Sequence, residues 1–509
     1  MLESDDYVSE YKTFGTPCIK TKKQIMDELS EPCSRFAFDV RKIKSDFNVM
    51  KKASRIDPLS EQGLTLATDV PANWQAFARY LYEAEITLSK DILSPMARHD
   101  IPKLYAAGFH AGKVKKGDGR EADRSGYGVS LNDPLEAISK AAGELLERHF
   151  SSMYRSKDLL FASYEDLKRR RFGPKPLDIF SLNGFLPWQE ARWWKFKKNA
   201  STPIGWVRGE NLTRNMPVYI PAQLVYWNYS VEDEMMMLAE GNTNGAAGHF
   251  TRDEAILSAL LELIQRDGFT IHWLRNAHPH LIDERTIEDV PTKDILTRFK
   301  ESGVEAYLLD TTTDIGVPTC VCVCIDARGE HPHLYLAASA GFTVQSTIFS
   351  AILECIAVFN SLNFEKEPFI LENDYKPFTR LITRMERLRL WKGKEMIDRF
   401  RPFLKGPLVS EFEFMRGVQQ YETVRDQLGY IQNSLHALGD RYDIYIHEFK
   451  DPILDLLGYH VVRVVVPAAM NLYLNENLAQ LNTERLSSVP AKLGFKARQE
   501  LNPWPHPFP

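Results

Sequence analysis

The fold of this chain is decided by a helical pattern that occurs twice without a gap, as Glu136-Ala-Ile-Ser-Lys-Ala-Ala-Gly-Glu-Leu-Leu-Glu-Arg148 and as Glu254-Ala-Ile-Leu-Ser-Ala-Leu-Leu-Glu-Leu-Ile-Gln-Arg266. A third segment, Ile348-Phe-Ser-Ala-Ile-Leu-Glu-Cys-Ile-Ala357, follows the same plan around Glu354. A glycine-containing run precedes each copy, at Gly126–Gly128, Asn244–Gly248 and Ala340–Gly341. The period predicts three equivalent amphipathic helices, each entered from a glycine loop.

Each predicted helix gathers polar side chains on one face between apolar flanks. This face carries Lys140, Glu144 and Glu147 in the first helix, and Ser258, Glu262 and Gln265 in the second. Clustered carboxylates repel one another unless cations neutralise them, and Mg²⁺ binds oxygen ligands that it shares with phosphate. Arg148 and Arg266 end the two copies and are suited to bind phosphate. Several such helices facing one cleft predict a Mg²⁺ and nucleotide site, although one helix alone is more typical of surface ion pairs.

The composition narrows the class of protein. The chain has 509 residues, 44% hydrophobic and 26% charged, with a net charge of −5. That is typical of a globular protein and argues against one that binds nucleic acid over its whole surface. No apolar run approaches the ~18–20 residues of a membrane span, and the acidic N-terminus is unlike a signal peptide. Because the six cysteines form no disulfide framework, we expect a cytoplasmic protein. The charge balance and the lack of an apolar span predict neither a nucleic acid nor a membrane partner.

Short β-branched runs predict strands among these helices. They lie at Val218–Pro221, Ala306–Leu309, Thr319–Ile325, Leu334–Ala338 and Val461–Val466. Helices are predicted at 134–150, 251–275, 346–363, 376–392 and 420–438. The alternation indicates a mixed α and β class. Cys320, Cys322 and Cys324 share one face of a predicted strand, and we interpret them as core residues rather than zinc ligands.

Three segments fall outside this pattern. Residues 1–51 are polar and Lys-rich, and we interpret them as an N-terminal extension before a catalytic unit at 52–509. The stretch Gly112–Gly128 is polar and glycine-rich, which predicts a mobile loop. The end, Asn502-Pro-Trp-Pro-His-Pro-Phe-Pro509, can form neither a helix nor a central strand, so a stiff, extended tail is expected at 502–509.

As an ordered set, these motifs resemble those of the YcaO superfamily. Gly126-Tyr-Gly-Val-Ser130 with the first helix resembles its first ATP motif, and Thr243-Asn-Gly-Ala-Ala-Gly248 with the second helix resembles its second. Asp310-Thr-Thr-Thr-Asp-Ile-Gly-Val-Pro318 and the Glu354 helix are similar to its central and third elements. The resemblance implies the α+β YcaO fold, with three mixed α/β subdomains around a central ATP and Mg²⁺ cleft.

The proline-rich tail resembles that of the azoline-forming branch, the cyclodehydratases of ribosomal peptide natural products. This resemblance implies a subunit that uses ATP and Mg²⁺ to convert Cys of a precursor peptide into thiazoline, with Ser or Thr to oxazoline left open. A side-chain nucleophile attacks the preceding carbonyl, and phosphorylation of the amide oxygen makes it a competent leaving group. Two alternatives remain: a relative that makes a thioamide or amidine, and a catalytically impaired scaffold that binds peptide.

The resemblance also implies roles for individual residues. The expected metal ligands are Glu144, Glu147, Glu262 and Gln265. The expected ATP and phosphate contacts are Arg266, Asn244, Lys140, Ser258, Arg148 and Glu354. The carboxylate of Pro509 is expected in the active site, and His506 is a candidate proton-transfer group whose alternative role is to pack the tail.

Some positions depart from the pattern of the family. Lys140 stands where a small or hydroxyl residue is usual, Gln265 replaces a second glutamate, and Ser350 and Ala357 stand where Arg and Gln are frequent. Gln265 can still offer an uncharged oxygen to Mg²⁺, and Lys140 can reach phosphate. These departures are what motivates the scaffold alternative.

Partners follow from the same resemblance. The substrate is expected to be a precursor peptide. Residues 1–51 are too short and polar to form a leader-binding domain, which predicts a separate E1-like partner with a peptide-recognition element. A flavin dehydrogenase is left open as a further partner, and a homodimer within a larger complex is expected.

Overall fold

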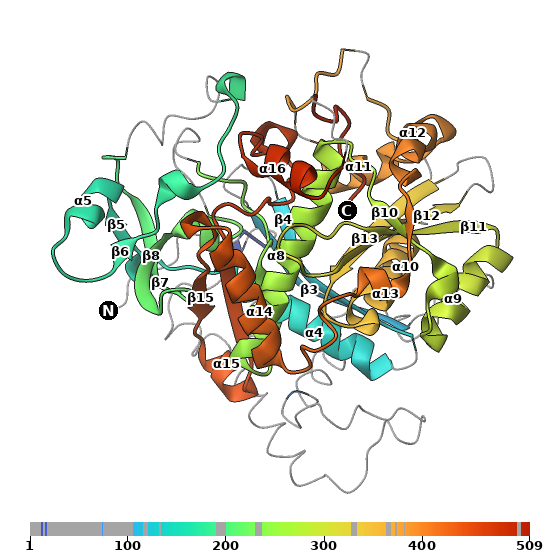
Figure 1. The fold of residues 1–509 in the computed structure, drawn as a ribbon. Helices are drawn as coiled ribbons and strands as arrows, with labels where there is room; N and C mark the ends of the chain where they lie inside the picture. The colour runs from blue at the N-terminus through green and yellow to red at the C-terminus, as the bar shows by residue number, and fades with distance from the viewer. Residues whose placement is uncertain are drawn as a thin grey trace, which may run out of the picture.

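A computed structural model describes most of the chain beyond residue 104 (Figure 1). The described residues are 12–13, 16–17, 74, 105–115, 121–131, 134–189, 200–229, 237–326, 333–362, 368–371, 374–380, 382–495 and 500–508. Apart from the short strands β1 (Lys12–Thr13) and β2 (Thr16–Pro17), the predicted extension lies outside them. Among the described helices, none has both the length and the apolar character that crossing a bilayer requires.

Two β-sheets form the frame of the described part of the chain. The first has the order β6-β8-β7-β15-β16-β9 with β5 beside β7, and the second has the order β13-β12-β11-β10-β14. The strands of the first are β5 (Leu160–Ala162), β6 (Lys175–Pro176), β7 (Ile204–Asn211), β8 (Met216–Pro221), β9 (Ala246–His249), β15 (Tyr445–Phe449) and β16 (His460–Val465). Those of the second are β10 (His280–Ile282), β11 (Val304–Asp310), β12 (Thr319–Asp326), β13 (His333–Ala340) and β14 (Leu408–Val409). All five strands predicted from the sequence are therefore confirmed.

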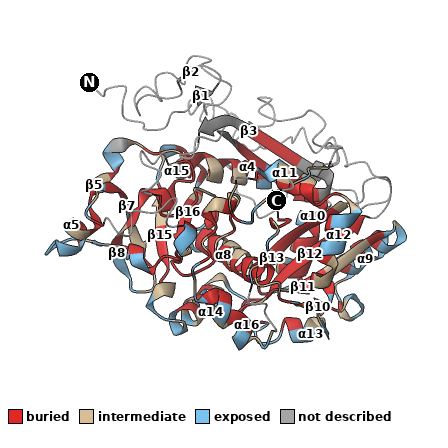
Figure 2. Ribbon diagram, turned by 90° about the horizontal axis from the view of Figure 1, so that it is seen from above, coloured by how far each residue is buried: buried red, intermediate tan, exposed pale blue. Residues whose placement is uncertain are grey.

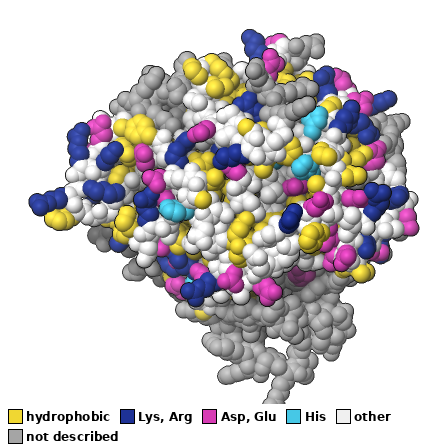
Figure 3. All heavy atoms as spheres, in the orientation of Figure 1, with side chains coloured by type: hydrophobic (Ala, Val, Ile, Leu, Met, Phe, Trp, Pro, Cys, Tyr) yellow, Lys and Arg dark blue, Asp and Glu magenta, His cyan; other side chains and the backbone are white. Residues whose placement is uncertain are grey.

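Helix α8 (Arg252–Leu274) lies between the two sheets (Figure 1) and packs on β9 and β16 of one and on β12 and β13 of the other. Figure 2 shows that this helix and the strands beside it are largely buried. The other helices are α4 (Pro134–Phe150), α5 (Tyr164–Arg169), α7 (Ala222–Val225), α9 (Val290–Glu301), α10 (Ser350–Leu362), α11 (Arg384–Leu390), α12 (Lys394–Phe400), α13 (Glu411–Phe414), α14 (Val424–Ala437), α15 (Pro452–Leu457) and α16 (Arg485–Lys492). The face seen in Figure 3 mixes acidic and basic side chains, as a net charge near zero implies.

Four of the five predicted helices are confirmed, and the one predicted at 376–392 is too long. Among the described residues of that range, only those of α11 are helical. Phe378 has a positive φ of 58°, which a continuing helix cannot accommodate. Thr383 then begins a new helix through a capping box with Glu386.

The mobile loop predicted at 112–128 is wrong, because most of it belongs to a hairpin of β3 (Tyr105–Lys115) and β4 (Glu121–Ser130). Strand β4 lies directly on α4. A Cβ on Gly126 would come within 2.1 Å of the Ala141 carbonyl oxygen, and one on Gly128 within 2.0 Å of the Ala137 oxygen. These glycines therefore permit close packing of strand on helix rather than loop motion.

The cysteine-rich strand β12 has the predicted arrangement. Cys320, Cys322 and Cys324 are fully buried in one apolar cluster, whereas the intervening Val321 and Val323 belong to another. The sulfur atoms of Cys322 and Cys324 are 3.9 Å apart, the Cys355 sulfur lies within 4.8 Å of both, and all three residues belong to the same buried cluster. This burial supports their interpretation as core residues.

The proline-rich tail crosses the C-terminal end of α8. The Asn502 N–H donates to the Leu274 carbonyl at 2.8 Å, and the indoles of Trp273 and Trp391 donate to the Trp504 and Pro505 carbonyls at 3.2 and 3.1 Å. Tryptophan donors suit this segment because prolines lack an N–H and offer only carbonyls. The described part of the tail is neither helix nor strand, as predicted.

Candidate active site

Four glutamates from three helices form a carboxylate cluster. Helix α4 supplies Glu144 and Glu147, α8 supplies Glu262, and α10 supplies Glu354. The helices meet because α4 and α8 both pack on β9, while α4 and α10 both pack on β4. The charges of Glu262 and Glu144 act on Glu147, and that of Glu144 acts on Glu354. The repeated helical faces therefore converge, as the sequence predicted.

Burial and mutual repulsion act on two carboxylates of the cluster, although arginines lie close to it. Burial raises the pKa of Glu147 well above its ordinary value, and the charges of Glu262 and Glu144 raise it further. Burial and then the charge of Glu144 also raise the pKa of Glu354, against the opposing charges of Lys140 and Arg266. A site of this kind favours an added cation that binds oxygen.

Two arginines flank the cluster at the ends of the repeated motifs. Arg148 Nη2 lies 2.5 Å from Glu144 Oε1, and Arg266 Nη2 lies 3.4 Å from Glu262 Oε1. The Nε and Nη1 atoms of Arg266 are buried and have no hydrogen-bond partner among the described residues. The Arg266 guanidinium also lies over the Phe508 ring, 4.3 Å from its centroid. Arg266 is therefore oriented by the tail, with donors left for an anion.

The two glycine-containing runs at 126–128 and 244–248 each donate one backbone N–H to a glutamate side chain of the cluster. The Tyr127 N–H donates to Glu144 Oε2 at 2.6 Å, and the Gly245 N–H donates to Glu262 Oε2 at 2.8 Å. Gly245 has a φ of 76°, and a Cβ there would lie 2.5 Å from the Val464 carbonyl oxygen, so only glycine fits. The neighbouring Asn244 is buried and donates its Nδ2–H to the Leu472 carbonyl at 2.8 Å.

Sequence reasoning missed two arginines at this site. Arg463 lies on β16, and burial lowers its pKa to about 10 against the charges of Glu262 and Glu147. Arg384 begins α11, and burial together with the charge of Arg148 lowers its pKa. Arg463 interrupts a run of valines at 461–466, and an arginine in a strand that is otherwise buried is a usable signal. The sequence around Arg384 held no comparable signal, because its helix comes close to the cluster only through the tertiary fold.

Three predicted residues are only loosely tied to the cluster. Lys140 pairs with Glu136 at 2.6 Å and donates to the Val129 carbonyl at 3.2 Å, and its charge acts on Glu354. Ser258 and Gln265 are half-buried on α8, and neither side chain forms a hydrogen bond or ion pair with another described residue. Their metal and phosphate roles stay predictions.

The two expected catalytic groups of the tail differ in status. His506 is buried, and its Nε2 lies 2.6 Å from the Tyr473 carbonyl, which makes Nε2 the protonated nitrogen. Burial and the charge of Arg387 lower the pKa of His506 well below its usual value, so the ring is neutral at pH ~7. These contacts support a tail-packing role for His506 rather than proton transfer. Pro509 lies outside the described residues.

The residues present fit Mg²⁺ and a nucleotide. Glu147 and Glu354 offer carboxylate oxygens to which no described residue donates a hydrogen bond, and carboxylate oxygens are ligands of Mg²⁺. Beside them, Arg266 keeps buried N–H groups that no described residue accepts, as a phosphate contact requires.

We expect Mg²⁺ to raise the melting temperature more at about pH 8 than at about pH 6. The folded pKa of Glu147 lies above its ordinary 4.5, so the folded protein keeps a proton that the unfolded chain has lost. The metal-free protein therefore loses stability as the pH rises from 4.5 toward the raised pKa of Glu147. Once Glu147 is ionised, Mg²⁺ relieves its repulsion by Glu262 and Glu144. Thermal unfolding with and without MgCl₂ measures this. The variant Glu147→Gln should show a smaller difference between the two pH values, because only the raised pKa of Glu354 is left in the cluster, and equal shifts at both pH values in the parent protein would contradict the prediction.

The fold is a mixed α and β one, and its repeated helices meet around a carboxylate cluster whose residues fit Mg²⁺ and a nucleotide. A family model described as YcaO cyclodehydratase, ATP- and Mg²⁺-binding, matches residues 125–470. The match spans more than half of the chain and includes all four glutamates of the cluster. The chain therefore belongs to the YcaO family, and the resemblance found in its sequence is confirmed.

Curated relatives match only parts of the chain. An uncharacterized protein of Methanothermobacter thermautotrophicus is 34% identical over 131 residues, which is 26% of this chain and 34% of that protein. An uncharacterized protein in the tfuA 3′ region of Rhizobium leguminosarum bv. trifolii is 26% identical over 360 residues, covering 66% of this chain and 74% of that protein. The chain thus spans about a third of the first relative's length and about three quarters of the second's.

Solved structures share the fold. A heterocyclase in complex with substrate and cofactor aligns with a TM-score of 0.63 and 19% identity, over 87% of this chain and 59% of that one. YcaO from Methanopyrus kandleri, bound with AMPPCP and Mg²⁺, aligns with a TM-score of 0.52 and 18% identity, over 81% of this chain and 95% of that one. A chain of the E. coli microcin synthetase McbBCD complex aligns with a TM-score of 0.52 and 13% identity, over 81% of this chain and 95% of that one. These likenesses confirm the mixed α and β class, while the three subdomains and the boundary at residue 52 stay predictions.

Proposed function

We propose that this chain is the cyclodehydratase subunit that uses ATP and Mg²⁺ to convert Cys residues of a ribosomal precursor peptide into thiazolines, with Ser and Thr as further candidates. The observation that carries the proposal is the carboxylate cluster beside Arg266, whose free donors lie under Phe508 of the proline-rich tail. The tail thus reaches a residue of the nucleotide site, as an azoline-forming enzyme of this family is expected to arrange it.

Each group of side chains has a defined task in this proposal. The metal ligands are Glu144, Glu147, Glu262 and Gln265. The nucleotide contacts are Arg266, Arg148, Asn244, Ser258, Lys140 and Glu354. Bound Mg²⁺ supplies charge neutralisation for the phosphates. The free N–H groups of Arg266 hold a phosphate oxygen, and the tail fixes the orientation of that arginine.

The proposed reaction needs positioning more than acid–base chemistry. The thiol of the target residue loses its proton and adds to the preceding carbonyl carbon, and the resulting oxyanion takes the γ-phosphoryl group of ATP as ADP leaves. The amide oxygen then departs as phosphate rather than as hydroxide, while the amide nitrogen loses its proton. The protein must therefore hold a phosphate and a peptide carbonyl in contact and keep bulk water away. The carboxyl group of Pro509 is the candidate proton acceptor, and His506 packs the tail that carries it.

The proposal extends to partners. A separate leader-binding protein of the E1-like type presents the precursor, a flavin dehydrogenase is a further candidate, and the chain forms a homodimer within a cytoplasmic complex. The McbBCD synthetase, whose solved structures include a complex with pro-MccB17, supports an assembly of several proteins on a peptide substrate.

The test uses the purified chain with the short peptide and the leader-binding protein encoded by neighbouring reading frames. We expect the peptide to lose one water per ring, by mass spectrometry, only when ATP, Mg²⁺ and the partner are all present. Ring formation without the partner would refute the partner requirement. A gain of sulfur without a ring would decide for the thioamide alternative, and absence of nucleotide binding by calorimetry would decide for the scaffold.

A further inference from the structure

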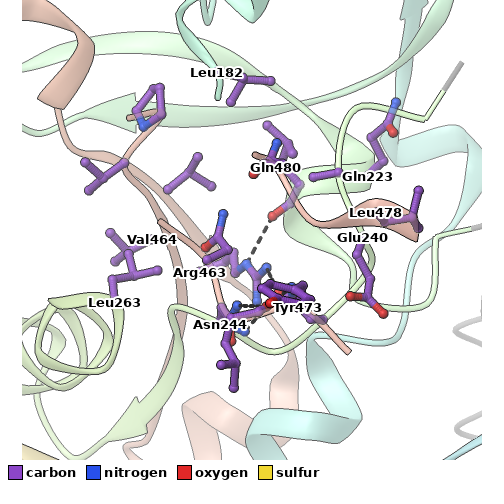
Figure 4. Close-up of a pocket in the computed structure, with 18 residues that line it drawn as sticks. Leu182, Gln223, Glu240, Asn244, Leu263, Arg463, Val464, Tyr473, Leu478 and Gln480 are labelled. Atoms are coloured by element: carbon purple, nitrogen blue, oxygen red, sulfur yellow. Dashed lines mark hydrogen bonds between the residues drawn. The ribbon is translucent and has the colours of Figure 1, made fainter. Parts of the chain in front are cut away.

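A pocket opens beside the carboxylate cluster, between β16, the loop at 242–244 and the segment at 471–480. Its empty space is about 640 Å³, the mouth included. Figure 4 shows the Arg463 side chain extending across this pocket, with Asn244 and Tyr473 close to its guanidinium. Asp267 of α8 anchors one wall, because its Oδ1 accepts from the Met470 N–H at 2.8 Å.

The lining of the pocket suits a peptide better than a triphosphate. Apolar walls come from Leu224, Leu263, Val464 and Leu478, and neutral amides come from Gln223, Asn242, Asn244, Asn471 and Gln480. Among the lining residues, Arg463 is the one cation. The one anion, Glu240, already accepts the Leu474 and Asn475 N–H groups at 2.7 and 3.1 Å. Neutral amides can form hydrogen bonds with a peptide backbone, and apolar surface can contact one of its side chains. A triphosphate instead needs several cations, and this pocket offers one.

Arg463 lies between this pocket and the carboxylate cluster. Only 6% of the residue is exposed, its Nε donates to the Leu224 carbonyl at 3.0 Å, and its Nη2 donates to Asn242 Oδ1 at 3.4 Å. Its Nη1 is buried and has no partner among the described residues. On the other side, Glu262 and Glu147 act on its charge. A buried guanidinium nitrogen without an acceptor is costly unless a ligand supplies one.

We propose that the pocket binds the target residue of the peptide and that Arg463 is a catalytic residue, which contacts the amide oxygen that becomes phosphorylated. This inference rests on the proposed function and names the peptide subsite of the same centre. When the thiol sulfur bonds to the carbonyl carbon, the π pair of the carbonyl moves to oxygen and the thiol proton passes to the proton acceptor of the proposed reaction. The oxyanion then takes the γ-phosphoryl group as its bond to ADP breaks, and phosphate leaves as the amide nitrogen loses its proton. The guanidinium stabilises that oxyanion at the border between the peptide and the phosphates.

The first test separates a contact with the peptide from a contact with phosphate. Arg463→Met removes the charge, and Arg463→Lys keeps it on a shorter side chain. We expect Arg463→Met to lower the kcat of ring formation by roughly 10²–10³-fold. The affinity for Mg²⁺ and AMPPNP, measured by calorimetry without peptide, should not fall, because removing a cation beside Glu262 and Glu147 favours Mg²⁺ there. Arg463→Lys should recover part of kcat. Unchanged turnover, or a parallel loss of nucleotide affinity, overturns the proposal.

The second test probes the pocket by binding alone, so it holds even if Arg463→Met does not fold. Ala239 lines the pocket and is half-buried. Ala239→Phe should fill the space and weaken binding of a fluorescently labelled precursor at least about tenfold, while Ala239→Ser and the nucleotide affinity of both variants stay unchanged. Equal peptide affinity of the two variants overturns the subsite. If the parent protein binds peptide here but makes no ring, the proposed function fails and the subsite stands.

Discussion

Replacing Glu262 with glutamine should lower ring formation by roughly 10³-fold, about 4 kcal/mol of transition-state free energy, with little effect on folding. Glu262 accepts the Gly245 N–H at 2.8 Å and faces Arg266 and Glu147. The amide oxygen of glutamine keeps the hydrogen bond from Gly245, but the charge that binds Mg²⁺ is lost. The free energy of unfolding should change by less than about 1 kcal/mol. Mass spectrometry of the product and chemical denaturation measure the two quantities.

Glu254→Gln is the matched control for Glu262→Gln. Glu254 lies in the first turn of the same helix, where it pairs with His249 at 2.8 Å. The same substitution there should leave turnover and Mg²⁺ affinity unchanged. A Glu262→Gln variant that keeps turnover but loses several kcal/mol of stability would make the glutamate a structural residue and refute the metal site.

Deleting Pro507–Pro509 should lower turnover by roughly 10²-fold or more and weaken nucleotide affinity less, by up to about tenfold. The deletion removes the Phe508 ring, which lies 4.3 Å from the Arg266 guanidinium and 4.9 Å from the Phe269 ring. Losing the cation–π contact costs nucleotide binding up to about 1.4 kcal/mol, which corresponds to that tenfold loss. Turnover loses in addition the carboxyl terminus expected in the active site. Calorimetry with AMPPNP and product mass spectrometry separate the two effects.

A control for the tail comes from its outer contact. The Arg399 guanidinium lies 4.1 Å from the Trp504 ring, away from the carboxylate cluster. Arg399→Gln should loosen the tail there without changing turnover by more than about twofold. If the deletion lowers turnover and nucleotide affinity by the same factor, the tail is only a structural strap.

Much of the candidate site was accessible from the sequence. The repeat predicted the helices that carry Glu144, Glu147, Glu262 and Glu354, because residues four apart share a helical face whatever the helix packs against. The prediction of a mobile loop at 112–128 was wrong because of its glycines. Gly126 and Gly128 favoured a loop by composition, yet their function is to let β4 lie on α4, and that contact cannot be read from local pattern.

The remaining residues could not be predicted because their partners are far away in the chain. Arg463 donates to a carbonyl 239 residues earlier, and the Arg387 guanidinium pairs with Glu476 at 2.9 Å and donates to the His506 carbonyl at 3.3 Å. The sequence allowed His506 to titrate or to pack the tail. Burial beside Arg387 supports packing, since desolvation disfavours the charged ring.

By itself, the sequence determined the periodic elements, the family and the carboxylates that share helical faces, since these depend on spacing along a few turns of chain. Only the tertiary structure decided that three such faces meet, that Arg463 stands between them and a pocket, and that Phe508 of the tail covers Arg266. Those features depend on which buried surfaces pack together, and a buried charge takes its properties from neighbours that local sequence does not specify.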